Sequence, residues 1–140
     1  MEITRIRIML VDDHKIVRDS WKILLENNPL FDVVEACALT DLVPAIARQV
    51  KPDIILLDIH LSPAISYAMA EKLRRELPEV KLIGLSANNQ PKVAIRMLSI
   101  GASGYLTKTS SLEEINRGIV EVHNGTVFVS EEVKKFILGN

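Results

Sequence analysis

The sequence predicts an α/β fold, a doubly wound five-stranded parallel sheet with helices on both faces. Strand-like apolar runs alternate with helix-like segments along nearly the whole chain, which is the pattern of repeated β–α units. The runs are continuously apolar, as in residues 54–57, and this is typical of strands that are buried on both faces. Polar residues follow four of the runs, at the edge where open sheets of this kind bind ligands.

The composition indicates one folded domain and excludes several classes of protein. A length of 140 residues suits a single core, and one Trp, two Tyr and three Phe leave aliphatic residues to build it. The net charge is −1 and no basic cluster suggests a nucleic-acid surface. Cys37 is the single cysteine, which excludes an internal disulfide. We find no signal peptide or membrane-spanning run, and therefore expect a cytoplasmic protein without a membrane contact.

The first half of the chain predicts three strands and three helices. In order, they are a strand over 5–11, a helix over 15–27, a strand over 31–38, a helix over 41–50, a strand over 54–57 and a helix over 66–77. Apolar residues at helical spacing indicate the helices, and runs rich in valine or isoleucine indicate the strands. Thr40 or Asp41 can cap the second helix, while Pro29, Pro52 and Pro78 prevent helices from continuing.

The second half continues the alternation. It predicts a strand over 81–85, a helix over 91–100, a strand over 104–106, a helix over 111–124 and one more short helix over 131–138. Gly101 is placed to cap the end of the helix before it. Leu112, Ile115 and Ile119 share one face of the later helix, which we interpret first as core and only second as a dimer surface.

Five polar residues fall at the ends of the predicted strands: Asp12, Asp13, Asp58, Ser86 and Lys108. Three carboxylates this close repel one another unless a cation joins them, and Mg²⁺ prefers such oxygen ligands. A carboxylate can also attack phosphorus and form an aspartyl-phosphate, while a hydroxyl and an ammonium bind the phosphoryl oxygens. Strand-end aspartates can instead be simple loop starts or helix caps, but that explanation fits the whole set poorly.

Four sequence pieces extend this to a family resemblance. They are Val11-Asp12-Asp13-His14, Ile55-Leu56-Leu57-Asp58, Leu85-Ser86-Ala87 and the run from Gly101 to Lys108. In this order and spacing, residues 5–129 resemble the receiver domain of bacterial two-component response regulators, most of all the NarL/LuxR class. The resemblance implies a flavodoxin-like (CheY-like) sheet with strand order 2-1-3-4-5.

The resemblance also implies a phosphoryl and metal site. Asp58 would accept a phosphoryl group from a sensor histidine kinase. Asp13, Asp58 and the backbone carbonyl of His60 would bind Mg²⁺ as cofactor, and Asp12 would complete the metal site through water. Lys108 would contact the phosphoryl group.

A conformational switch is implied as well. Ser86 would move toward the phosphoryl group after transfer, and Tyr105 would turn inward behind it. This is a population shift between two conformations, and hydrolysis of the aspartyl-phosphate would reset it.

Two segments depart from the family pattern. Receivers usually have proline four residues and glycine eight residues after the phosphoacceptor, where this chain has Ser62 and Ser66, with Pro63 one place late. The apolar segment 64–68 that follows is either a partner contact or local packing. Thr109 stands where proline usually follows the lysine, which leaves open whether that peptide bond is cis.

Two other functions compete with the phosphorylated switch. One is an unphosphorylated interaction module with the same fold. The other is a phosphohydrolase with an aspartate nucleophile, which is disfavoured because His60 stands where such enzymes carry a second aspartate.

The domain organisation completes these expectations. We expect residues 1–129 to be the receiver and 130–140 to begin a linker to an output domain. DNA would be contacted only through that output domain, which lies outside this chain, and a homodimer is a further partner to test.

Overall fold

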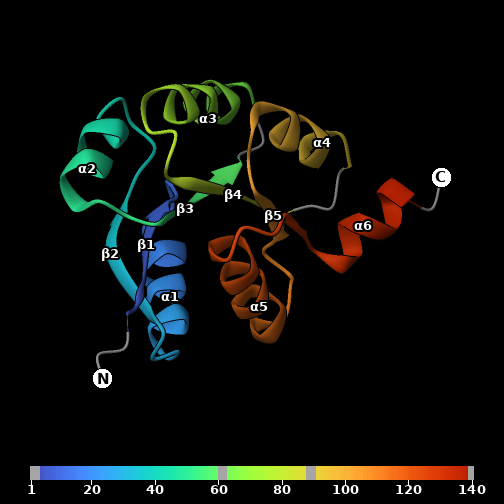
Figure 1. Cartoon of the computed structure of the whole chain (residues 1–140), viewed down its shortest axis with the longest axis horizontal. Coiled ribbons are helices and arrows are strands. Elements are labelled where there is room, and N and C mark those ends of the chain that lie inside the picture. The colour runs from blue at the N-terminus through green and yellow to red at the C-terminus, as the bar shows by residue number, and fades with distance from the viewer. Residues whose placement is uncertain (1–3, 60–62, 88–90, 139–140) are drawn as a thin grey trace.

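A parallel sheet stands between two layers of helices in the computed structural model, which describes residues 4–59, 63–87 and 91–138 (Figure 1). The strands are β1 (Ile6–Val11), β2 (Phe31–Cys37), β3 (Ile54–Ile59), β4 (Lys81–Ser86), β5 (Gly104–Thr107) and β6 (Phe128–Val129). The helices are α1 (Lys15–Glu26), α2 (Val43–Val50), α3 (Pro63–Glu76), α4 (Pro91–Ile100), α5 (Leu112–His123) and α6 (Glu131–Leu138). The predicted α/β class with helices on both faces is confirmed.

The sheet has six strands in the order β2-β1-β3-β4-β5-β6, all paired in parallel. The order 2-1-3-4-5 expected for the first five strands is confirmed, but the expected number of five is wrong for this chain. The sixth strand is the two-residue β6, which pairs with Gly104 and Tyr105 at the open edge of β5. A run of two residues is too short to show a strand pattern in the sequence.

Two helices begin at other residues than predicted, because proline and the turn before each helix set their first residues. α3 begins at Pro63, three residues early, because proline suits the first turn of a helix. The apolar segment 64–68 is therefore part of this helix. At α2 the N-cap position falls on Leu42, and the Thr40 hydroxyl oxygen instead accepts from the Leu42 amide in the turn before it. At α5 the Ser111 side chain accepts from the Glu114 amide as a side-chain cap does.

Two apolar clusters cover the two faces of the sheet. One joins the sheet to α2, α3, α4 and α6, and the other joins it to α1 and α5. Strand residues alternate between the clusters, so that Met9 and Leu57 face one and Ile8 and Leu56 face the other. The continuous apolar runs in the sequence are explained by this double coverage.

The C-terminal helix α6 is part of the fold and packs beside α4 beyond the end of the sheet (Figure 1). Its Val133 is fully buried and belongs to the cluster that holds Tyr105 and Met97. Before it, β6 is accommodated because Gly118 of α5 has no side chain, since a Cβ there would lie 2.8 Å from Cδ1 of Phe128. Across the described ranges, we find no helix of the length and apolarity that crossing a membrane requires.

Candidate functional site

Three strands deliver the principal polar residues to one end of the sheet. Asp12 directly follows β1, Asp58 is the penultimate residue of β3, and Lys108 follows β5. Asp12 and Asp58 are only 4% and 3% exposed. Because buried carboxylates are costly unless a positive charge or hydrogen bonds stabilise them, their partners decide what this site can do.

Lys108 joins the two buried carboxylates. Its Nζ lies 2.8 Å from Oδ1 of Asp58 and 3.1 Å from Oδ2 of Asp12. Burial by itself lowers the pKa of Lys108, but the contacts with Asp58 and then Asp12 outweigh it and raise the pKa above its usual value. The ammonium is therefore firmly charged and bridges two acids that come from separate strands.

His14, which precedes α1, and Arg18 of α1 both bind Asp12. Oδ1 of Asp12 accepts from the His14 amide at 2.8 Å, and Nδ1 of His14 lies 3.3 Å from the same oxygen. Nη1 of Arg18 donates to the carbonyl oxygen of Asp12 at 2.7 Å. In the described ranges, Asp12, His14 and Asp58 each offer a ligand atom within 4.8 Å of the others, which is compact enough for one metal ion.

Asp13 has a different environment from Asp12. Its side chain is exposed, and Oδ1 accepts from the Leu39 amide at 2.7 Å, so the carboxylate links the loops after β1 and β2. The compact group of possible ligands does not include it in the described structure. His60 and Ser62, with the carbonyl expected to bind metal, lie outside the described residues.

The two departures from the family pattern have structural counterparts. Ser66 is fully buried in α3, and its Oγ donates to the backbone oxygen of Asp58 at 3.0 Å. The Lys108–Thr109 bond is trans, since no peptide bond of the described chain is cis. The Thr109 hydroxyl donates to Oε2 of Glu132 at 3.2 Å, so the residue after Lys108 contacts α6.

Ser86 and Tyr105, the two predicted switch residues, lie side by side on β4 and β5. Tyr105 is fully buried, and its ring occupies space left by Gly84, where a Cβ would lie 3.2 Å from Cδ2 of the ring. Burial raises the pKa of the Tyr105 phenol, and the neighbouring Ser86 hydroxyl opposes that rise. Among the residues that the structure describes, the Tyr105 hydroxyl has no hydrogen-bond partner of ordinary geometry.

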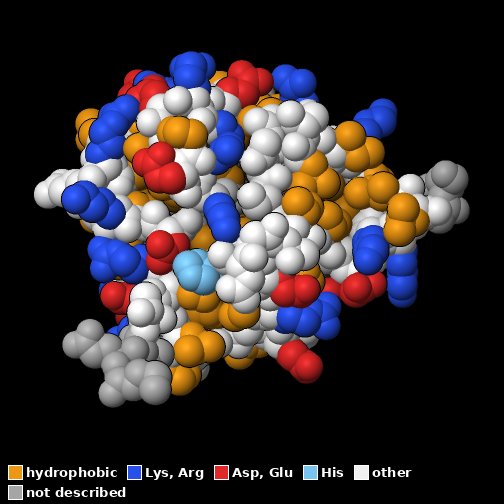
Figure 2. Space-filling model, in the orientation of Figure 1, with side chains coloured by type: hydrophobic (Ala, Val, Ile, Leu, Met, Phe, Trp, Pro, Cys, Tyr) orange, Lys and Arg blue, Asp and Glu red, His pale blue; other side chains and the backbone are white. Residues whose placement is uncertain are grey.

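A shallow cleft opens next to Lys108, between α1 and α5. Its volume is about 240 Å³, and its lining residues are Ile16, Val17, Ser20, Trp21, Leu24, Lys108, Ser110, Leu112 and Ile115. Apolar side chains gather over α1 on this face of the molecule (Figure 2), where Ile16, Ile23 and Leu24 are exposed. An apolar surface therefore adjoins the charged pocket.

Two residues that hold the pocket, Arg18 and Ser66, are not among those predicted for the site from the sequence. Arg18 lies in α1, where the helical spacing of apolar residues indicates the face that packs against the sheet. That spacing does not indicate a bond from Arg18 to the Asp12 backbone. For Ser66 the sequence offers one signal, which is a serine where receivers usually have glycine, eight residues after Asp58. That substitution adds a hydroxyl at a position where the family has no side chain.

Comparison with known proteins places these features in context. The response regulator receiver domain family matches residues 8–119. The chain is 30% identical over 135 residues to the transcriptional regulatory protein MctR of Rhizobium johnstonii, covering 96% of this chain and 63% of that protein. It is 28% identical over 128 residues to the response regulator GacA of Pseudomonas aeruginosa, covering 91% of this chain and 60% of that protein. The chain thus spans about three fifths of the length of these relatives.

A solved structure agrees over the whole chain. A two-component response regulator of the LuxR family from Aurantimonas sp. SI85-9A1 superposes with a TM-score of 0.90 at 28% identity, covering 97% of each chain. The isolated REC domain of RcsB from Salmonella enterica, at 19% identity and a TM-score of 0.82, shares the fold.

Proposed function

The chain belongs to the response regulator receiver domain family, and from that premise we propose that Asp58 is its phosphoacceptor and Lys108 its phosphoryl-binding cation. The observation that carries this is the position of Lys108, whose Nζ bridges the buried carboxylates of Asp58 and Asp12. A cation held beside an acceptor carboxylate is suited to bind the oxygens of an incoming phosphoryl group.

Receiver domains bind Mg²⁺ at an acidic pocket, and the donors in this chain suit that ion. Asp12 and Asp58 supply carboxylate oxygens from two strands within one compact group. We propose that these two residues, with Asp13 and the backbone carbonyl of His60, hold Mg²⁺. When bound, the ion supplies positive charge beside the oxygens of the transferring group.

The proposed transfer is a displacement at phosphorus. A carboxylate oxygen of Asp58 forms the new bond to phosphorus, while the phosphorus–nitrogen bond of a phosphohistidine breaks and its electron pair leaves with the imidazole. Lys108 stays charged throughout, because its contacts raise its pKa. Hydrolysis of the aspartyl-phosphate by water then returns Asp58 to its carboxylate.

We propose that Ser86 and Tyr105 transmit the change. Ser86 is the last residue of β4 and pairs with Ile59, the residue after Asp58, and its hydroxyl would hydrogen-bond a phosphoryl oxygen. Tyr105 is already buried in this structure. The phosphoryl group would therefore raise the population of this buried conformation and would not produce a new one. The affected surface is then the one formed by α4, β5 and α5.

The expected phosphodonor is a sensor histidine kinase. The cleft between α1 and α5 supports this, because Lys108 lines it together with apolar residues such as Ile16 and Leu112. A partner bound in this cleft would lie beside Lys108, which contacts Asp58.

We further propose that residues 130–140 lead toward an output domain that regulates transcription, as the name of the similar MctR suggests. DNA binding and homodimer formation would belong to that longer protein. The structural support is that α6 packs beside α4, so the end of the chain lies next to the proposed switch surface.

The test is intact-mass spectrometry after incubation with Mg²⁺ and acetyl phosphate. We expect the wild type to gain the mass of one phosphoryl group and Asp58→Asn to gain none. Asp32→Asn, which removes a partly exposed carboxylate at the start of β2, at the opposite end of the sheet from the pocket, is the matched control and should gain the same mass as the wild type. Omission of Mg²⁺ should abolish the gain.

An interaction module without phosphorylation remains the second candidate function. Absence of a mass gain, together with demonstrated Mg²⁺ binding, would support that alternative and direct attention to the altered segment after Asp58. A mass gain in Asp58→Asn would assign the phosphoryl group to another residue.

A further inference from the structure

The hydroxyl of Ser66 makes a buried bond to the backbone of the residue proposed to carry the phosphoryl group. Ser66 lies in the first turns of α3 and is fully buried, and its Oγ donates to the main-chain oxygen of Asp58 at 3.0 Å. We propose that Ser66 is a positioning residue for phosphotransfer, holding the end of β3 so that the Asp58 carboxylate keeps its orientation toward Lys108. This inference rests on the proposed function.

Other serines in the helices show that this bond is not a general property of helical serine. Ser20 donates to the backbone oxygen of Ile16 and Ser99 to that of Arg96, each within its own helix and on an exposed face. Such bonds to the preceding turn are what a helical serine ordinarily makes. Ser66 instead donates out of its helix to a strand, across eight positions of sequence.

The bond joins the end of β3 to the first turns of α3. β3 ends at Ile59 and α3 begins at Pro63, so a link from residue 58 to residue 66 encloses the whole connection. The same connection contains the backbone carbonyl of His60 that we propose as a metal ligand. Loss of the link would therefore loosen the end of β3, where Asp58 lies.

The orientation of Asp58 depends on its backbone because its side chain is short. The side chain has only two rotatable bonds, so in any one rotamer the position of the backbone determines where the oxygens lie. Lys108 holds the carboxylate at 2.8 Å, and the Ser66 hydroxyl holds the opposite, main-chain end of the same residue. Because reaction rates fall steeply when reacting groups are displaced, even a small movement of Asp58 should slow transfer.

The experiment compares Ser66→Ala with wild type in the rate of phosphorylation by acetyl phosphate at saturating Mg²⁺, corrected for the folded fraction. We expect the limiting rate to fall about tenfold while the acetyl phosphate concentration at half-maximal rate stays nearly unchanged, since the donor does not contact Ser66. Ser66→Thr, which keeps a hydroxyl, should recover most of the rate. Ser99→Ala, which removes a hydroxyl bonded within its own helix, should behave as wild type.

A purely structural role predicts a different result. It would lower the stability of Ser66→Ala in urea but leave the rate per folded molecule unchanged, and that outcome would overturn the proposal. So would failure of both Ser66→Ala and Ser66→Gly to fold, because the residue would then serve the fold alone. If wild type itself takes no phosphoryl group, the proposed function fails together with this inference, whereas normal wild type with a normal Ser66→Ala rate rejects the inference alone.

Discussion

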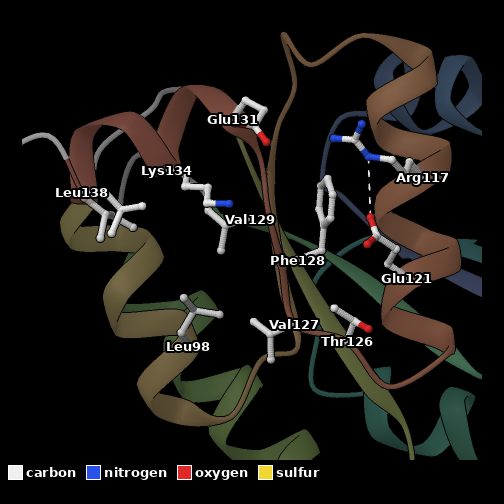
Figure 3. A pocket seen from close by; sticks show the side chains of 11 residues that line it. Leu98, Arg117, Glu121, Thr126, Val127, Phe128, Val129, Glu131, Lys134 and Leu138 are labelled. Atoms are coloured by element: carbon white, nitrogen blue, oxygen red, sulfur yellow. Dashed lines mark ion pairs between the residues drawn. The ribbon is translucent and has the colours of Figure 1, made fainter.

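Two regions of this molecule treat charge in opposite ways. In the acid pocket, formed by Asp12, Asp58 and Lys108, two carboxylates are buried and share one ammonium. The second region is the α6 cleft, about 720 Å³ in volume and lined by Leu98, Arg117, Glu121, Thr126, Val127, Phe128, Val129, Glu131, Lys134, Ile137 and Leu138. In that cleft the charged side chains stay exposed: Arg117 and Glu121 form a partly exposed pair at 3.6 Å beside the apolar side chain of Phe128 (Figure 3).

This difference indicates that the acid pocket serves chemistry, whereas the residues around α6 serve packing. Buried charges cost free energy unless they are paired, and even paired charges add little to the stability of a fold. Exposed pairs such as Arg117–Glu121 contribute little, and α6 is held mainly by buried apolar groups such as Val133. Thr109, the residue after Lys108, donates its hydroxyl to Glu132 of α6, so the chain next to the pocket contacts the helix that borders the cleft.

The largest effect should follow from removing the shared cation. Lys108→Ala removes the ammonium that the two buried carboxylates share, and we expect the free energy of unfolding to fall by about 3 kcal/mol without Mg²⁺. Added Mg²⁺ should restore much of this loss, because a cation again joins the acids. Urea unfolding with and without Mg²⁺ measures both effects.

Lys92→Ala is the control for this prediction, since Lys92 is an exposed lysine of α4. Its stability should stay within about 0.5 kcal/mol of wild type. If Lys108→Ala proves as stable as this control, the two regions do not differ in the way described.

The next effect concerns the apolar attachment of α6. Val133→Ala removes two methyl groups from a fully buried site and should cost about 2 kcal/mol. Leu138→Ala, in the same helix but 73% exposed, should cost less than about 0.5 kcal/mol. Equal losses in urea unfolding would show that α6 is not held by burial of one face.

A smaller effect is expected at the junction of α5 and β6. Gly118→Ala places a Cβ 2.8 Å from Cδ1 of Phe128, and the resulting overpacking should outweigh the gain in helix propensity, for a net loss of about 1 kcal/mol. Combining it with Phe128→Leu should recover part of the loss. A double-mutant cycle measures the coupling, and additive losses would contradict the proposed clash.

The smallest effect is a change in alkaline stability. The carboxylates raise the pKa of Lys108 in the folded state, so its contribution is complete below its usual value of 10.5 and is lost as the pH rises through the higher folded value. Burial raises the pKa of the Cys37 thiol from 9.0 to about 11, so Cys37 also loses its contribution to stability between those pH values. The effect of Lys108 is therefore measured in proteins that carry Cys37→Ser.

In that background, Lys108→Met should flatten the decline of stability above pH 10.5, as measured by urea unfolding. Tyr105, whose pKa burial also raises, is present in both proteins and should leave the same residual decline. An unchanged slope would mean that the folded protein does not bind the Lys108 proton more tightly than the unfolded chain.

The sequence by itself determined the fold class, the order of the elements and the residues at the sheet edge. This was possible because periodicity reports directly on burial, and parallel strands bring their carboxyl ends to one side. Asp12, Asp58 and Lys108 could thus be grouped although they lie far apart in the chain. The number of strands was wrong, because β6 is too short to carry a pattern.

Only the tertiary structure decided how those residues are held. The bond from Ser66 to the Asp58 backbone and the bond from Arg18 to the Asp12 backbone depend on how a helix packs against a strand, which local periodicity does not encode. The same is true of Asp13, whose bond to the Leu39 amide depends on the approach of two loops. Side-chain type and spacing determine which chemistry is available, whereas packing determines which atoms meet.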